Sequence, residues 1–87
     1  MAVRFKEGVT CERVEDEGII VDAYGGRYID LNRSALEMVF ALCEEPDQQS
    51  AVDRLLHLFN ADRETLSKDL QNMLDRLRAL GLTADDS

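Results

Sequence analysis

The chain has 87 residues, a formal net charge of −8 and 45% hydrophobic residues. This length supports a single domain over residues 1–87, with an ordered core at about 10–82. The acidity argues against nucleic acid as the main partner, because phosphate binding requires clustered Lys and Arg. No apolar run approaches the roughly 18 residues of a membrane span, and no targeting segment opens the chain. We therefore expect a cytoplasmic protein without a membrane partner.

The first half of the chain has the pattern of a β-meander, with strands expected at residues 10–14, 18–23 and 27–31. The Gly25-Gly26 pair marks a hairpin between the last two strands. A three-residue loop, Tyr24-Gly25-Gly26, would place Val21 opposite Ile29. That register puts Ile19, Val21, Ala23, Ile29 and Leu31 on one face, and Ile20, Asp22, Tyr28 and Asp30 on the other. We predict it because burial selects the register that gathers apolar side chains.

The second half has the period of three helices, each preceded by a residue suited to cap it. Asn32, Asp47 and Asp62 are the expected N-caps. The corresponding apolar stripes are Leu36, Val39, Phe40 and Cys43; then Val52, Leu55, Leu56 and Phe59; then Leu66, Leu70, Met73, Leu74, Leu77 and Leu80. Gly81 should end the last helix, and residues 83–87 should form a frayed acidic tail. The predicted fold is α+β, a three-stranded antiparallel meander followed by three α-helices on one sheet face.

Nothing in the chain indicates catalysis, and we expect no catalytic residue, no metal and no cofactor. Cys11 and Cys43 are too far apart for a CxxC motif, so we expect two reduced, partly buried thiols. His57 is the single histidine and has no second histidine near it. No nucleophile with a neighbouring base can be assembled.

The meander leaves two sheet edges whose backbone groups are unpaired, and an edge beside a helix can bind an extended peptide. The apolar stripe of the last helix is wider than one core contact requires. For Leu70, Leu74 and Leu77 the core is the favoured interpretation. For Leu66, Met73 and the edge of the strand at 27–31, core and binding groove are both open.

Several short motifs resemble one known family. The run Tyr28-Ile29-Asp30-Leu31-Asn32 resembles the "y-x-x-L-N" signature of PqqD-like peptide-recognition proteins. The segments at 59–65 and 73–77, with Asp69 between them and Gly81-Leu82 after them, resemble that family's C-terminal half. The resemblance covers residues 10–82 and is strongest to the stand-alone recognition proteins of lasso-peptide biosynthesis.

The resemblance implies a winged-helix-like fold that binds the leader segment of a ribosomally made precursor peptide. The leader would add as a further strand and lie between the strand at 27–31 and the last helix. The implied peptide-binding residues are Arg27, Tyr28, Ile29, Asp30 and Leu31 of the strand, and Leu66, Asp69, Leu70, Met73, Arg76 and Leu77 of the helix. A leader peptidase (a cysteine protease), and through it a macrocyclase, are the other implied partners. A winged-helix nucleic-acid-binding domain and a homodimeric assembly domain are the alternatives.

Overall fold

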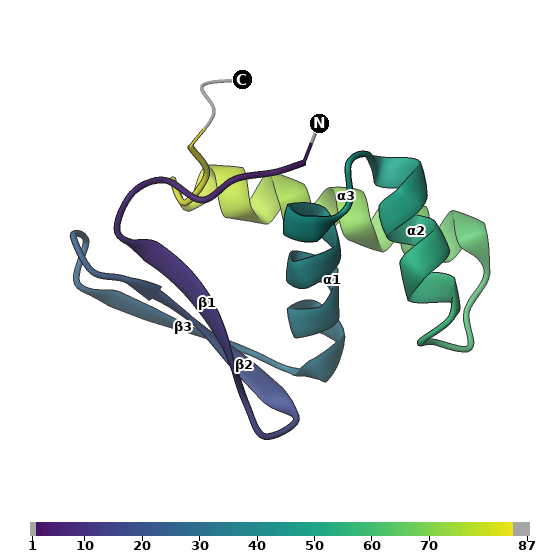
Figure 1. Ribbon diagram of the computed structural model, residues 1–87, viewed down its shortest axis with the longest axis horizontal. Helices are drawn as coiled ribbons and strands as arrows, with labels where there is room; N and C mark the ends of the chain where they lie inside the picture. Colours follow the sequence, from purple (N-terminus) through teal and green to yellow (C-terminus); the bar gives the residue numbers. More distant parts are fainter. Residues whose placement is uncertain (1, 85–87) are drawn as a thin grey trace.

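The computed structural model describes residues 2–84. Three strands, β1 (Val9–Val14), β2 (Glu17–Asp22) and β3 (Arg27–Leu31), form one antiparallel sheet in the order β1-β2-β3. Three helices follow, α1 (Arg33–Glu44), α2 (Gln48–Leu56) and α3 (Arg63–Ala79), and they confirm the predicted fold class (Figure 1). Within the described residues no helix combines the length and apolarity needed to cross a bilayer.

Each helix begins at its predicted N-cap. The side chain of Asn32 accepts a hydrogen bond from the Ala35 N–H at 2.9 Å, that of Asp47 from Ser50 at 2.8 Å, and that of Asp62 from Thr65 at 2.7 Å. These bonds satisfy N–H groups that have no partner within the first helical turn. Local sequence alone therefore determines where the three helices start.

The end of α3 is also closed as predicted. Gly81 has a φ of +73°, its N–H donates to the Arg78 carbonyl, and the Leu82 N–H donates to the Leu77 carbonyl at 3.0 Å. This pair of bonds is the Schellman motif, which requires a left-handed residue and so favours glycine.

The core lies where α1 is enclosed by the inner face of the sheet, α2 and α3. The largest fully buried side chains are those of Ile20, Leu36, Val39, Leu55, Leu70, Leu77 and Leu82. The sheet packs closely against α1 at Gly18, where an added Cβ would lie 2.3 Å from Leu36 Cδ1. Because the helices occupy only this face, the opposite face of the sheet is left uncovered by any described element (Figure 1).

The predicted hairpin register is wrong by one residue. Ile20 lies opposite Ile29 and Val21 opposite Tyr28, and the loop comprises residues 23–26. The predicted faces of β3 are correct, since Leu31 is buried while Tyr28 and Asp30 are exposed. The predicted faces of β2 are reversed.

A polar contact explains the reversal of β2. Asp22 is only 2% exposed, but its carboxylate accepts hydrogen bonds from the Gly25 N–H at 2.9 Å and from Arg27 Nη2 at 2.9 Å. A buried carboxylate is tolerated when it is paired and hydrogen-bonded. The register therefore gives Asp22 its partners and moves Ile19 and Val21 to the outer face.

The conformation of the segment before β1 could not be predicted from the sequence. In the structure this segment contacts the last turn of α1 and the residues that follow α3. The Val3 N–H donates to the Leu42 carbonyl at 2.9 Å, and Phe5 forms an isolated antiparallel bridge with Thr83. The Ala84 N–H donates to the Arg4 carbonyl. The predicted frayed tail is thus wrong for residues 83 and 84, while residues 85–87 lie outside the described part.

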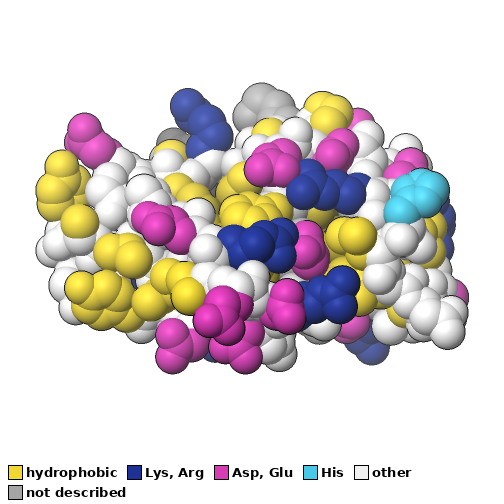
Figure 2. Space-filling view, turned by 60° about the horizontal axis from the view of Figure 1, so that its bottom comes forward, with side chains coloured by type: hydrophobic (Ala, Val, Ile, Leu, Met, Phe, Trp, Pro, Cys, Tyr) yellow, Lys and Arg dark blue, Asp and Glu magenta, His cyan; other side chains and the backbone are white. Residues whose placement is uncertain are grey.

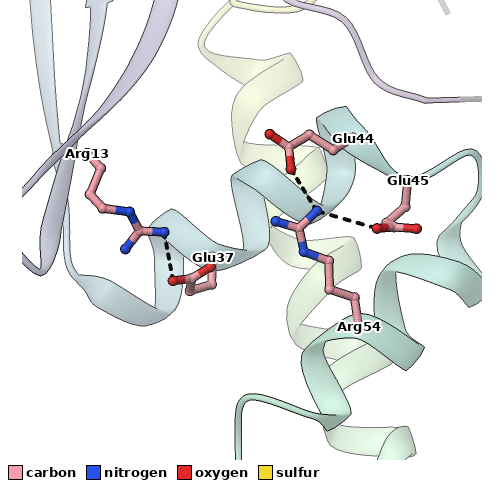
Figure 3. Close-up of polar contacts among 5 residues, drawn as sticks. All are labelled: Arg13, Glu37, Glu44, Glu45 and Arg54. Atoms are coloured by element: carbon pink, nitrogen blue, oxygen red, sulfur yellow. Dashed lines mark hydrogen bonds and ion pairs between the residues drawn. The ribbon is translucent and has the colours of Figure 1, made fainter.

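Two arginines link the elements around α1 (Figure 3). Arg13 of β1 pairs with Glu37 at 3.0 Å and lies 5.4 Å from the centroid of the Phe40 ring. Arg54 of α2 pairs with Glu44 at 2.8 Å. The first contact joins the sheet to α1, and the second joins α2 to the end of α1.

Candidate functional site

The first component of the site is the edge of the sheet formed by β3. β3 pairs with β2 on one side, and within residues 2–84 no other strand pairs with it. An edge strand presents backbone N–H and C=O groups to an incoming strand. Tyr28, which is 73% exposed, and Asp30 stand on the outer face beside this edge. Ile29 is half-buried and Leu31 is buried on the inner face.

Arg27 connects the start of β3 to the end of α3. Its guanidinium donates to the Asp22 carboxylate and, through Nη2, to the Leu80 carbonyl at 2.8 Å. The hydrogen bond from the Gly25 N–H, followed by the bonds from Arg27, lowers the pKa of Asp22 below its ordinary value. The Arg27 side chain therefore contributes to holding the start of β3 against the end of α3.

The second component is a hollow of about 290 Å³ next to the other end of β3. Its lining comes from the β3–α1 junction and from α3, namely Asn32, Ser34, Ala35, Met38, Asp69, Asn72, Met73 and Arg76. We call it the α1–α3 hollow. Ala35 and the two methionines supply apolar surface, and the other five residues are polar. Such a lining suits an apolar side chain that is flanked by polar groups, and methionine adapts to irregular shapes.

The predicted peptide-binding residues of α3 fall into two sets in the structure. Asp69, Met73 and Arg76 line the α1–α3 hollow. Leu66, Leu70 and Leu77 are buried in the core, with exposed fractions of 3%, 0% and 2%. The structure confirms the core interpretation that was favoured for Leu70 and Leu77, and it places Leu66 in the core as well. These three residues pack α3 into the core.

Five lining residues were not predicted as site residues from the sequence, namely Asn32, Ser34, Ala35, Met38 and Asn72; of these, Asn32 was predicted only as an N-cap. A signal was present at Met38, which is apolar but lies outside the stripe formed by Leu36, Val39, Phe40 and Cys43. It packs against the core and also borders the hollow. Polar residues such as Asn72 carry no such signal, because their place in the hollow depends on how α1 and α3 pack.

Outside this region the described chain has few groups suited to chemistry. Burial raises the pKa of the Cys11 and Cys43 thiols to about 11, so both are protonated and weakly nucleophilic at neutral pH. His57 is exposed. No group of three or more His, Cys, Asp or Glu side chains in residues 2–84 is arranged to hold a metal ion. The edge of β3 with the α1–α3 hollow is therefore the candidate site.

Two solved structures are similar to this one over nearly their whole length. One is of TbiB1 in complex with the TbiA(beta) leader peptide; it is 21% identical, covers 97% of this chain and 98% of its own, and has a TM-score of 0.84. The other is of lasso peptide synthetase B1 complexed with the leader peptide; it is 16% identical, covers 98% of this chain and 100% of its own, and has a TM-score of 0.85. At these identities the likeness establishes the fold. No curated relative matches the chain.

The family is established by a family model that matches most of the chain. The model of PqqD, coenzyme PQQ synthesis protein D, matches residues 17–82, which include β2, β3 and all three helices. The matched region also contains the edge of β3 and the lining of the α1–α3 hollow. This chain therefore belongs to the PqqD family.

Proposed function

We propose that this protein is a recognition protein without catalytic activity of its own, and that it binds the leader segment of a ribosomally made precursor peptide. The observation that carries the proposal is the open edge of β3 beside the α1–α3 hollow, on a fold shared with two proteins solved with leader peptides. The precursor class named for the second of these structures, the lasso peptides, is the class that we propose here.

The leader would bind by adding a strand to β3. Backbone hydrogen bonds along Arg27–Leu31 would supply affinity without depending on side chains. Specificity would come from the α1–α3 hollow, where one apolar leader side chain would contact Met73 and Met38. Asp69 and Arg76 are at its rim, and each could bind an opposite charge on the leader.

The bound leader would be presented to a leader peptidase of the cysteine-protease type, and through it to a macrocyclase. Holding the substrate on a protein that also contacts the enzyme raises the effective concentration of the cleavage site. Recognition and cleavage would then be separate tasks, which agrees with a surface that fits binding rather than chemistry.

The proposal predicts that Tyr28→Ala and Met73→Asp each weaken leader binding by roughly tenfold, because one removes an exposed contact beside the edge and the other places a charge in an apolar hollow. Fluorescence polarisation of a labelled leader peptide would measure the affinities. Tyr24→Ala is the matched control for Tyr28, since Tyr24 is equally exposed at 76% but lies in the hairpin loop.

Ser67→Asp is the control for Met73→Asp, because Ser67 is exposed on α3 but faces α2. Circular dichroism should show native folding for all four variants. If the wild-type protein binds the leader and both test variants bind it equally well, the placement of the site is incorrect. If the wild-type protein does not bind the leader, the function itself is incorrect.

A further inference from the structure

The outer face of the sheet carries apolar side chains that no described element covers. The observed register places eight residues there, namely Thr10, Glu12, Val14, Glu17, Ile19, Val21, Tyr28 and Asp30. Tyr28 lies opposite Val21, Ile19 follows on β2, and Val14 stands at the end of β1. We call these four residues the outer stripe. It runs diagonally from the edge strand across the sheet.

The outer stripe is exposed enough to serve as a contact surface. Tyr28 and Val14 are 73% and 57% exposed, which places them among the few exposed large hydrophobic residues of the described chain. Ile19 and Val21 are half-buried. Grouped apolar side chains on a solvated face mark an interaction site more often than isolated ones do. Figure 2 shows hydrophobic side chains gathered at the sheet end of the molecule, with acidic side chains next to them.

The charged residues on the outer face of the strands are all acidic. Glu12 and Asp30 flank Ile19, and Glu17 lies opposite Val14. The two arginines of the strands are on the inner face, where Arg13 pairs with Glu37 and Arg27 with Asp22. The outer face thus has three carboxylates and no Lys or Arg among its eight residues.

This charge pattern selects one class of occupant. A second copy of the chain would bring three carboxylates against three more, and an anionic membrane surface would also be repelled. A protein with an apolar patch bordered by Lys and Arg complements both features. We propose that the outer stripe docks such a protein, and that this partner is the leader peptidase.

The choice of the peptidase rests on the proposed function and on the position of Tyr28. Tyr28 belongs both to the outer stripe and to the edge of β3, so a strand added at that edge would continue the same face of the sheet. A partner on the outer stripe would stand beside the bound leader. The two surfaces share Tyr28 but can be tested separately, because Glu12 and Glu17 lie on β1 and β2, away from that edge.

Charge reversal tests the proposal. The double variant Glu12→Lys, Glu17→Lys should bind the peptidase from the same biosynthetic pathway roughly tenfold more weakly, since rim charges steer and orient docking. Its affinity for the labelled leader should remain within about twofold of the wild-type value, because neither residue is at the proposed peptide site. Biolayer interferometry with immobilised peptidase and fluorescence polarisation with the leader would measure the two quantities on the same preparations.

Two further variants make the result interpretable. Ile19→Thr keeps a β-branched residue in the strand while removing apolar area, and it should also weaken peptidase binding. Asp75→Lys reverses an exposed charge on α3 outside the sheet and should not weaken peptidase binding.

Unchanged peptidase affinity in both the double variant and Ile19→Thr would overturn the proposal. So would a wild-type dimer in sedimentation that Ile19→Thr dissociates, because the occupant would then be a second copy. Failure of the wild-type protein to bind leader would contradict the proposed function instead.

Discussion

Asp22 is the residue on which the geometry of the hairpin depends. Its carboxylate is buried beneath the loop and accepts bonds from the Gly25 N–H and from Arg27, which in turn donates to Leu80 at the end of α3. One acidic side chain therefore closes the loop, sets the register and ties β3 to α3. The two contacts to Asp22 are stronger when its carboxyl is ionised, because a protonated carboxyl accepts hydrogen bonds less strongly and loses its charge attraction to Arg27.

The state of Asp22 predicts how stability depends on pH. Its pKa is lowered in the folded protein, so its stabilising contribution is complete above the ordinary carboxyl pKa, near 4. That contribution is lost as the pH falls below this value toward the folded pKa. Asp22→Asn should thus lower stability at pH 7, and the difference from wild type should narrow in acid.

Urea denaturation at pH 7 and at roughly pH 3 would measure this difference. Asp16→Asn is the matched control, since Asp16 is exposed in the turn between β1 and β2 and should behave as wild type. If the difference in the free energy of unfolding between Asp22→Asn and wild type is the same at both pH values, the role of the ionised carboxylate is contradicted.

At the scale of elements, the boundaries could be predicted from the sequence because they are set by local contacts. The caps at Asn32, Asp47 and Asp62 each bond to a residue three positions later. The hairpin register could not, because it follows from the polar contacts that bury Asp22, and Arg27, one of its partners, is itself bonded to Leu80, 53 residues away. The candidate site divides in the same way. The edge strand could be predicted from the order of the strands. Met38 and Asn72 line the α1–α3 hollow only because α1 and α3 pack together.

The contact between β2 and α1 gives a prediction at this scale. Gly18→Ala would place a Cβ 2.3 Å from Leu36 Cδ1 and 3.2 Å from the Glu12 carbonyl oxygen. Leu36 is fully buried, so it can make way only by repacking against its core neighbours. We expect a loss of about 1–3 kcal/mol in the free energy of unfolding, as for other overpacked sites.

Gly26→Asn is the comparison for Gly18→Ala. An added Cβ at Gly26 meets nothing within 4 Å, and its φ of +68° is one that Asn tolerates. Urea denaturation of both variants should show a much larger effect at Gly18. Equal effects would mean that the sheet and α1 are packed less closely than the structure has them.

For the whole molecule, the distribution of charge separates this protein from winged-helix proteins that bind nucleic acid. The net charge is −8, and several cations are already paired with carboxylates, namely Arg13, Arg27, Arg54 and Arg63. On α3, Lys68 and Arg76 are interleaved with Asp69 and Asp75. An apolar outer stripe with an acidic border completes a surface that fits peptides and proteins better than phosphates.

This distribution predicts that the protein does not bind duplex DNA. Non-specific DNA binders neutralise several phosphates and reach dissociation constants of about 10⁻⁴ to 10⁻⁶ M at physiological salt, and they bind more tightly when the salt is lowered. Here the long-range field is repulsive, so lowering the salt should increase the repulsion. A gel shift at low salt with roughly 10 µM protein should leave the duplex unshifted. A shift that weakens steeply with added salt would indicate a basic surface and would favour the nucleic-acid alternative, because counterion release requires clustered cations.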